Sequence, residues 1–267
     1  MASEPCVVLT RSPADNGELA AALTAQGVPV CELPCLQTGW ISPPVLPAGP
    51  DVLVFTSRRG VEGLGRLDGF EELLAPADAP APQRAVVGPS TAAALAALGY
   101  PAHTSAVPAT GAALARELNA NLKHSSRIAI VRGTMRAGGL DETLRTAGHR
   151  VEELVVYRNL PTDLPVHSPF PISAIFVSAP SGARRLLAAM PWMRHSPFLV
   201  LGPSTAATLE ELGATTIHRA RPIPNTWAPS LIALHRSAPP TLTELAPPPF
   251  ITPTTPPAFP PADQTPN

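Results

Sequence analysis

Short apolar runs alternate with Ala- and Leu-rich amphipathic segments from residue 5 to residue 236 of the chain. This alternation is typical of α/β proteins with parallel, doubly wound sheets, in which a helix follows each buried strand. Strands are predicted at 6–10, 51–56, 84–88, 127–131, 173–178 and 198–202. Helices are predicted to follow them at 13–26, 58–66, 90–98, 138–147, 180–190 and 204–212.

Three segments of the chain recur in the same order, which indicates an internal duplication. GPSTAAALAALG at 88–99 returns as GPSTAATLEELG at 202–213, DVLVFTS ending at Ser57 matches SAIFVS ending at Ser178, and VLTR ending at Arg11 matches IVRG around Arg132. Chance agreement of three segments in one order is improbable. The duplication predicts two similar α/β domains, with sheets flanked by helices, that face a shared cleft.

The repeat places hydroxyl side chains after strand ends in both halves of the chain. Ligands of open parallel sheets bind at that edge, where the first N–H groups of helices point toward them. Serine and threonine are also ordinary helix N-caps, so capping and ligand binding stay open as interpretations. The hydroxyl residues are Ser57, Ser90 and Thr91 in the first half, and Ser178, Ser204 and Thr205 in the second.

Arginines follow several of the same strand ends. Arg11 and Arg132 end equivalent strands, and a guanidinium group suits carboxylates and phosphates. For Arg58, Arg59 and Arg136, an exposed surface charge is the simpler interpretation.

Tyr157 is one of only two tyrosines, and it ends the segment ELVVYR just before the proline-rich stretch 160–171. A chain leaving one domain for the other would pass there. Tyr157 is therefore either an amphipathic aromatic packed at a domain junction or a neutral phenol that donates a hydrogen bond or proton into the cleft.

Composition excludes several classes of function. Only 15% of the residues are charged and the net charge is -1, so nothing indicates binding to nucleic acid or to an anionic membrane surface. The first residues do not form a signal peptide, and no run approaches the ~20 apolar residues of a membrane span. A cytoplasmic protein is expected.

Motifs for common cofactors and catalytic groups are absent from the sequence. Neither GxxxxGK[ST] nor GxGxxG occurs, and GxSxG and HExxH are missing as well. The cysteines Cys6, Cys31 and Cys35 are interpreted as core residues rather than metal ligands. The histidines at 103, 149 and 218 are interpreted as surface residues of helix-to-strand turns. The only lysine lies in the stretch 119–127, which looks like a loop.

Proline makes up 36 of the 267 residues and is concentrated in a few stretches. They are 42–50, 76–82, 160–171 and the segment 237–267. The last has little to bury and is interpreted as a flexible tail with polyproline character.

Together these segments resemble the uroporphyrinogen-III synthase family. The resemblance covers roughly residues 5–236 and rests on VLTR, DVLVFTS, the paired GPST segments, ELVVYR and FVSAPSG. It implies two domains interleaved in sequence, with 1–36 and 172–236 forming one and 40–156 forming an inserted second. Two strands would cross between them, and the proline-rich stretches 42–50 and 160–171 fit those crossings.

The resemblance also implies the reaction. The family cyclises hydroxymethylbilane, a linear tetrapyrrole with eight carboxylates, into uroporphyrinogen III and water. Loss of the terminal hydroxyl leaves an azafulvene, and attack by ring D through a spiro intermediate inverts that ring. Such a protein is a lyase of heme, cobalamin and siroheme biosynthesis. It needs no metal or cofactor, acts as a monomer, and receives its substrate from hydroxymethylbilane synthase.

Several residues carry over from the family. Tyr157 matches the tyrosine suspected of assisting departure of the hydroxyl, and Ser57, Thr91, Ser178 and Thr205 match hydroxyl positions that line the cleft. The family's site has few invariant charged groups, so Arg11 and Arg132 serve either structure or substrate. A two-lobed α/β binding protein for a carboxylated small molecule and a transferase with a nucleotide donor remain as alternatives.

Overall fold

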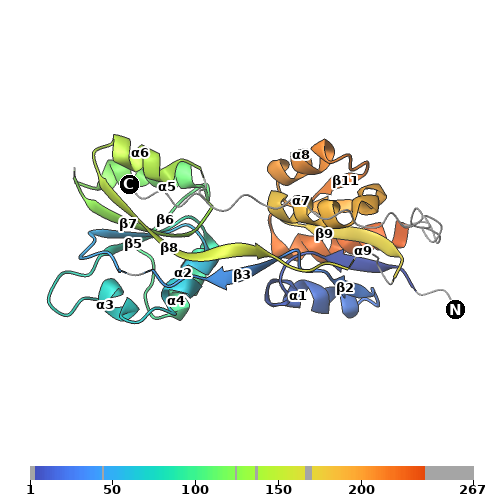
Figure 1. Ribbon diagram of the computed structural model, residues 1–267, viewed down its shortest axis with the longest axis horizontal. Helices are drawn as coiled ribbons and strands as arrows, with labels where there is room; N and C mark the ends of the chain where they lie inside the picture. Colours follow the sequence, from blue (N-terminus) through green and yellow to red (C-terminus); the bar gives the residue numbers. More distant parts are fainter. Residues whose placement is uncertain (1–3, 44, 124, 136–137, 166–169, 238–267) are drawn as a thin grey trace, which may run out of the picture.

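The computed structural model describes residues 4–43, 45–123, 125–135, 138–165 and 170–237. These residues form two α/β lobes, each built on one sheet, which Figure 1 shows side by side. We call them the five-stranded lobe and the six-stranded lobe. No helix in these ranges is both long enough and apolar enough to cross a membrane.

The strands of the five-stranded lobe are β1 (Cys6–Leu9), β2 (Val30–Glu32), β9 (Ile172–Val177), β10 (Phe198–Val200) and β11 (Ile217–Arg219). All pairs are parallel, in the order β11-β10-β9-β1-β2. The helices are α1 (Pro13–Thr24), α7 (Pro180–Ala189), α8 (Pro203–Glu211) and α9 (Trp227–Ser237), with short 3₁₀ helices at Pro191–His195 and Pro224–Thr226. Side chains of α1 and α9 share one hydrophobic cluster of the lobe, and those of α7 and α8 share the other.

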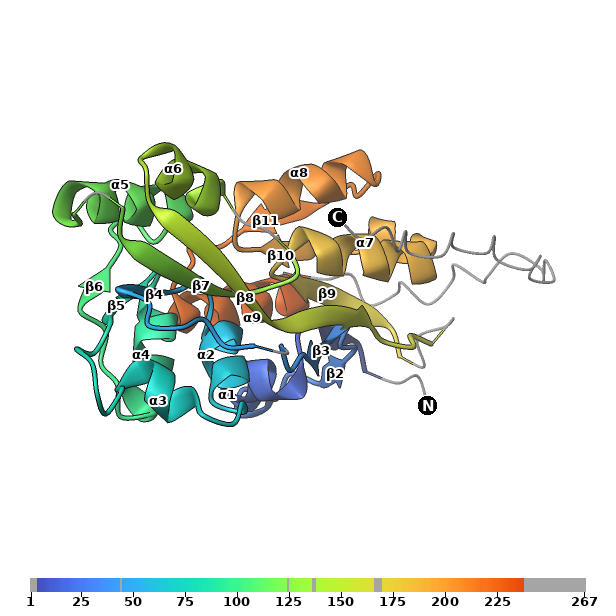
Figure 2. The ribbon, with the colours of Figure 1, turned by 60° about the vertical axis from the view of Figure 1, so that its left-hand side comes forward.

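The strands of the six-stranded lobe are β3 (Leu36–Trp40), β4 (Val52–Phe55), β5 (Gln83–Val86), β6 (Thr104–Ser105), β7 (Arg127–Gly133) and β8 (Arg150–Pro161). Their order is β3-β8-β7-β4-β5-β6, and every pair is parallel except β3 with β8. The helices are α2 (Arg58–Leu64), α3 (Phe70–Leu74), α4 (Pro89–Ala97), α5 (Gly111–Asn121) and α6 (Leu140–Thr146). As Figure 2 shows, α5 and α6 cover one face of the sheet, while α2, α3 and α4 cover the other.

The two sheets confirm the predicted duplication. Counted from β6, the six-stranded sheet runs β6-β5-β4-β7-β8, which matches β11-β10-β9-β1-β2 position for position. This match pairs β4 with β9, β5 with β10 and β7 with β1, and these are the segments that recur in the sequence. The strands of the five-stranded lobe are split in the chain, because β1 and β2 precede the six-stranded lobe and β9 to β11 follow it.

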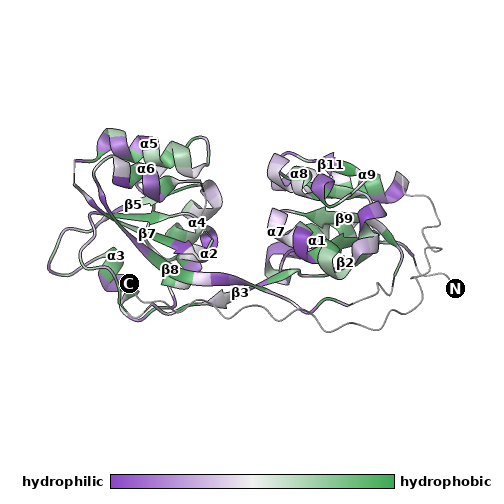
Figure 3. Cartoon of the chain, turned by 45° about the horizontal axis from the view of Figure 1, so that its top comes forward, coloured by the Kyte–Doolittle hydropathy of each residue, from purple (hydrophilic) through white to green (hydrophobic). Residues whose placement is uncertain are grey.

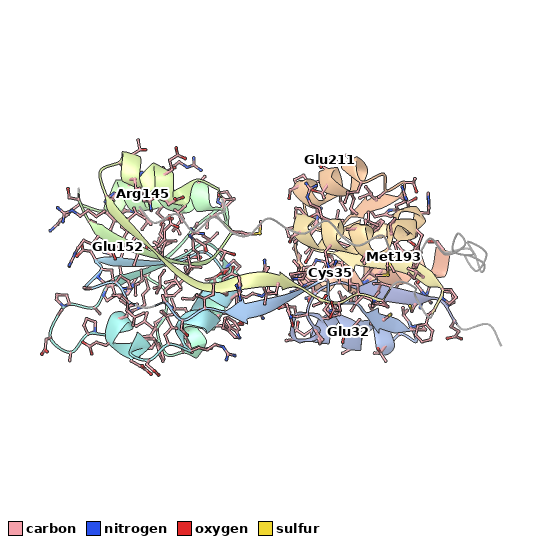
Figure 4. The ribbon with its side chains drawn as sticks, viewed as in Figure 1. Glu32, Cys35, Arg145, Glu152, Met193 and Glu211 are labelled. Carbon is pink, nitrogen blue, oxygen red and sulfur yellow. The ribbon has the colours of Figure 1, made fainter. Side chains whose placement is uncertain are left out.

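The chain passes between the sheets twice, between β2 and β3 and between β8 and β9. Cys35, labelled in Figure 4, is buried in the first of these links. The prediction of a crossing at 42–50 was wrong, because this stretch connects β3 to β4 of the same sheet. The domain limits 1–36 with 172–236, and 40–156, stay a prediction.

Most predicted elements are present with ends shifted by a few residues. The pattern missed the helices α3 and α5 and the strands β2, β3, β6, β8 and β11. The stretch 119–127 is not entirely a loop, since α5 continues to Asn121. His149 was wrongly interpreted as a surface residue. It is 7% exposed, and its backbone N–H donates to the Leu144 carbonyl at the end of α6.

Strands covered on both faces explain the continuous apolar runs of the sequence. Every residue of β1, β4 and β9 is buried. Figure 3 shows hydrophobic residues along β9, whereas the helices around it carry both hydrophilic and hydrophobic residues. Cys6 and Cys35 pack in the core of the five-stranded lobe and Cys31 lies half-buried against it, as the core interpretation predicted.

The predicted tail, residues 237–267, lies almost wholly outside the described residues; Ser237 ends α9. We expect a chain that ends at Ser237 to retain its melting temperature and its rate of turnover, because Leu231 of α9 is kept and the sequence beyond has little to bury. Thermal unfolding and steady-state kinetics of the shortened and full chains would check this. A large fall in either quantity would show that the tail packs on the lobes.

Candidate active site

A cavity of about 400 Å³ lies where residues that follow the carboxyl ends of strands come together from both sheets. The five-stranded lobe contributes Arg11 after β1 and Ser178 after β9. The six-stranded lobe contributes Ser57 after β4, Ser90 at the start of α4, and Tyr157 from β8. Both halves of the duplication therefore line one site, at the edge of the sheets where parallel folds bind ligands.

Tyr157 and Ser57 form a hydrogen-bonded pair in this cavity. The two hydroxyl oxygens are 3.0 Å apart. Ser57 is the N-cap of α2, and its Oγ accepts a hydrogen bond from the Gly60 backbone N–H at 3.1 Å. Ser57 therefore caps α2 and also lines the cavity, and the start of this helix fixes the position of the tyrosine hydroxyl.

Gly133 at the end of β7 sets the position of the Tyr157 ring. A Cβ atom on Gly133 would lie 2.5 Å from Cζ of that ring, well inside van der Waals contact. The register between β7 and β8 also shifts here, because Arg132 pairs with Val155 and Gly133 pairs with Tyr157. Such an irregularity re-aims a side chain near a site. The absence of a side chain at Gly133 is thus what allows the ring to lie against β7.

A cluster of charges joins the lobes beside the tyrosine. Asp15, in the first turn of α1, forms an ion pair with Arg58, and its Oδ2 atom accepts from Nη2 of Arg59 at 2.6 Å. Arg11 Nη2 lies 3.6 Å from Asp15 Oδ1. Arg58 and Arg59 are partly exposed, as the surface interpretation expected, but that interpretation missed that both bind a carboxylate of the other lobe. Arg136 lies outside the described residues.

The Asp15 carboxyl remains ionised in this setting. Burial on its own raises the pKa of Asp15, but the hydrogen bond from Ser12 and the charges of Arg59, Arg11 and Arg58 outweigh burial, so its pKa lies below the ordinary value. The Ser12 Oγ donor is 2.8 Å from Asp15 Oδ2. One anion thus faces three cations.

Arg11 also contacts an aromatic side chain of the cavity. Its guanidinium carbon lies 5.7 Å from the centroid of the Trp227 ring, a cation–π distance. Burial lowers the pKa of Arg11 below its usual value, partly offset by Asp15. Trp227 in turn packs on Phe176 of β9, with ring centroids 5.4 Å apart. The predicted substrate-binding arginine thus lies in the cavity on a fixed aromatic support.

The remaining hydroxyl residues do not all reach the cavity. Ser90 and Ser178 line it, whereas the side chains of Thr91 and Thr205 are buried inside their lobes. Ser204 is exposed on α8 and is not part of the lining. Capping by the GPST hydroxyls was a wrong interpretation, because the N-cap residues of α4 and α8 are Gly88 and Gly202 and no side chain caps either helix.

Arg132 is engaged in a network within the six-stranded lobe and does not line the cavity. Its Nε atom donates to Glu153 at 2.8 Å, and its Nη1 atom donates to the Gly133 carbonyl at 2.8 Å. Glu153 also pairs with Arg145, which Figure 4 labels on this lobe. The bond to the Gly133 carbonyl indicates that Arg132 holds the end of β7 beside Tyr157, in contrast to its sequence equivalent Arg11.

A second hollow of the described chain, about 640 Å³, lies in the loops at the opposite edge of the six-stranded sheet. Proline-rich stretches line it, and its one cation, Arg127, already pairs with Asp51 at 3.3 Å. It therefore has fewer cations to bind an anionic ligand than the interlobe cavity has. Among the described residues, no group of three or more His, Cys, Asp or Glu side chains could hold a metal ion.

Sequence reasoning missed Asp15, Gly133 and Trp227. Asp15 looks like an ordinary acidic residue in a first helical turn, and nothing local in the sequence indicates its partners on α2. Gly133 was visible only as the last letter of IVRG, where its repeat equivalent is Ser12. Trp227 begins α9, and nothing local in the sequence indicates that its ring lies against Arg11.

The fold and the cavity define a class: an α/β protein of two duplicated lobes whose shared cavity is lined by cations, hydroxyl groups and one tyrosine, a lining suited to a small anionic molecule. Comparison with known proteins narrows this class. A family model described as uroporphyrinogen-III synthase HemD matches residues 17–223, which is well over half of the chain. No curated protein sequence gives a significant match.

Two solved structures share the fold. Uroporphyrinogen-III synthetase from Helicobacter pylori superposes with a TM-score of 0.64 at 18% sequence identity, over 87% of this chain and 99% of that one. A mutant uroporphyrinogen III synthase from the extremely thermophilic bacterium Thermus thermophilus superposes with a TM-score of 0.58 at 19% identity, over the same shares. The chain belongs to the uroporphyrinogen-III synthase family. Its function therefore lies in tetrapyrrole biosynthesis.

Proposed function

We propose that this chain binds hydroxymethylbilane in the interlobe cavity and converts it into uroporphyrinogen III and water, which makes it a hydro-lyase. The observation that carries the proposal is the Tyr157 hydroxyl, held 3.0 Å from Ser57 in a cavity lined by both lobes. It is the one phenol of that lining, beside residues that can bind carboxylates.

The hydrogen bonds around Ser57 suggest which proton is free. Ser57 Oγ already accepts from the Gly60 N–H, so its own O–H can donate to the oxygen of Tyr157. The phenol proton can then point to the departing hydroxyl of the substrate. The hydroxyl leaves as water, and the proton that ring D loses from its free α-carbon on final closure restores the phenol, so the reaction balances.

The pyrrole nitrogens of the substrate supply most of the electronic push. The task left to the protein is to hold one conformation, so that ring D reacts at its substituted carbon and not by the simpler head-to-tail closure that gives the type I isomer. A cavity that holds the tetrapyrrole from two lobes is suited to that task. Ser90, Ser178 and Arg11 line this cavity and can donate to substrate carboxylates.

The remaining assignments follow the family expectation. We propose that Thr91, Ser204, Thr205 and Arg132 support the site from outside the cavity lining. The protein would act as a monomer in the cytoplasm and receive hydroxymethylbilane from its synthase.

Incubation with freshly prepared hydroxymethylbilane tests the proposal directly. The protein is first dialysed against a chelator and no coenzyme is added. We expect type III porphyrin to dominate after oxidation and chromatographic separation of the isomers, since the electronic push comes from the substrate itself. Type I alone, at the rate without protein, would favour a two-lobed binding protein. Activity restored only by a metal or coenzyme would contradict the cofactor-free reaction.

A further inference from the structure

The charge cluster at Asp15 spans the two lobes. Asp15 belongs to α1 of the five-stranded lobe, whereas Arg58 and Arg59 open α2 of the six-stranded lobe. Other ion pairs of the structure, such as Arg184 with Glu211, lie within one lobe. The cluster therefore ties the walls of the cavity together at the level of Tyr157.

The charges of the cavity do not balance. Its lining contains the three arginines Arg11, Arg58 and Arg59 and a single carboxylate, Asp15. Arg58 has a second partner in Glu62, with Nε and Oε1 3.2 Å apart, but Glu62 is not part of the lining. Guanidinium groups bind carboxylates through two parallel N–H donors, so these arginines could hold more anions than the lining provides.

The arginines also remain accessible from solvent. The side chains of Arg58 and Arg59 are 41% and 35% exposed, while that of Asp15 is only 5% exposed. A carboxylate that arrives in the cavity can thus reach the guanidinium groups without displacing packed side chains. Asp15 itself is held on its own lobe by the Ser12 hydroxyl.

We propose that Arg58 and Arg59 bind carboxylates of the substrate, and that Asp15 occupies them until the substrate arrives. Substrate carboxylates replace Asp15 on the two arginines. The exchange loosens the direct tie between the lobes and re-forms it through the substrate, so that the cavity closes on a molecule with several carboxylates and not on a neutral one. This inference rests on the proposed function, because it requires a polycarboxylate substrate.

The exchange predicts opposite effects on substrate binding when the arginines or the aspartate of the cluster are replaced. Removal of the arginine charges should weaken binding, whereas removal of the Asp15 charge should strengthen it, because a competitor is lost. If the cluster only stabilised the closed arrangement of the lobes, both changes would act in the same direction. The sign of the Asp15 effect therefore separates the proposal from a purely structural role.

The test compares Asp15→Asn, the double variant Arg58→Gln/Arg59→Gln and the triple variant that combines them. The probe is uroporphyrin III, a stable octacarboxylate, whose binding is followed by its fluorescence. We expect the dissociation constant to rise on the order of tenfold in the double arginine variant, since charge-assisted hydrogen bonds are lost. It should fall roughly threefold to tenfold in Asp15→Asn. In the arginine background, Asp15→Asn should change the dissociation constant much less than in the parent, since Arg11 is then the one cation of the cluster left to compete for.

Arg184→Gln is the matched control, because it breaks an exposed Arg–Glu pair away from the cavity and should leave the dissociation constant unchanged. Weaker or equal binding in Asp15→Asn, or parental binding in the double arginine variant, would overturn the proposal. If Asp15→Asn folds poorly, the comparison of the double arginine variant with the parent still tests the proposal. Isomer analysis of the parent protein tests the proposed function separately. If the parent forms type III but the parent and all variants bind uroporphyrin III with the same dissociation constant, this inference fails while the proposed function stands.

Discussion

Gly133→Ala is expected to lower kcat roughly 10- to 100-fold, as much as loss of the tyrosine hydroxyl itself, while the protein stays folded, because a shift of about 1 Å in a catalytic group can cost up to about 10²-fold. The added Cβ would lie 2.5 Å from Cζ and 2.6 Å from Cε2 of the Tyr157 ring. The ring must therefore move away from β7, and its hydroxyl must leave the 3.0 Å contact with Ser57. Steady-state kinetics with hydroxymethylbilane and thermal unfolding would measure the two effects.

Two further variants show whether Gly133 acts through the tyrosine hydroxyl. Gly39→Ala is the matched control, because its Cβ would meet the flexible end of Leu160 at 2.8 Å, on the same strand β8, and Gly39 does not line the cavity. It should change kcat little. In a Tyr157→Phe background, Gly133→Ala should cost much less than in the parent. Equal losses in both backgrounds would mean that Gly133 matters for packing alone.

Tyr157→Phe is expected to reduce kcat roughly 10- to 100-fold, at or below the lower end of general acid assistance. The substitution removes the donor and keeps the ring, so the packing against Gly133 and the fold should survive. The loss is limited because the pyrrole nitrogen already drives departure of the hydroxyl. The remaining turnover should still give type III, and type I should rise only as unprocessed substrate cyclises in solution.

Ser57→Ala provides the comparison for the tyrosine. It leaves the phenol but removes both the partner of its hydroxyl and the N-cap of α2, so we expect a smaller fall in kcat and a loss of about 1 kcal/mol in unfolding free energy. Parental kcat in Tyr157→Phe would make the tyrosine a packing residue. The cavity would then act through conformation and hydrogen bonds to the carboxylates alone.

The position of Tyr157 depends on how the lobes are connected. It lies in β8, the long strand Arg150–Pro161 that pairs with β7 along one part and with β3 along another. Its backbone pairs with Gly133 on one side and with Trp40 on the other. Strands on both sides therefore hold the tyrosine in place, whereas in a free linker between domains its hydroxyl would be mobile.

Strands, helices and the repeat depend on short stretches of chain, and the sequence indicated most of these features. Runs that are buried on both faces, such as DVLVF and AIFV, are apolar throughout or nearly so, and their strands could therefore be predicted together with the helices that follow. The repeated segments then fixed which strands are equivalent. Tyr157 could be picked out because it is one of two tyrosines and lies next to a proline-rich stretch.

Contacts between distant segments could not be predicted in this way. Whether 42–50 crosses between lobes depends on the pairing of β3 with β8, and that pairing leaves little trace in a five-residue strand. From the sequence, the hydroxyl groups of Thr91 and Thr205 were as good candidates for the cavity as those of Ser90 and Ser178. In the folded chain, the first turn of each helix points the threonine side chain into the core of its lobe.

The sequence by itself thus determined the two duplicated α/β units and the edge of the sheets at which the cavity lies, because strand burial and repeat order depend on local patterns. Only the tertiary structure decided which side chains meet at that edge. Arg11 and Arg132 occupy equivalent positions of the repeat, but one faces the cavity while the other is tied to Glu153. Asp15 meets Arg58 and Arg59 only because the folded chain brings α1 and α2 together from opposite lobes.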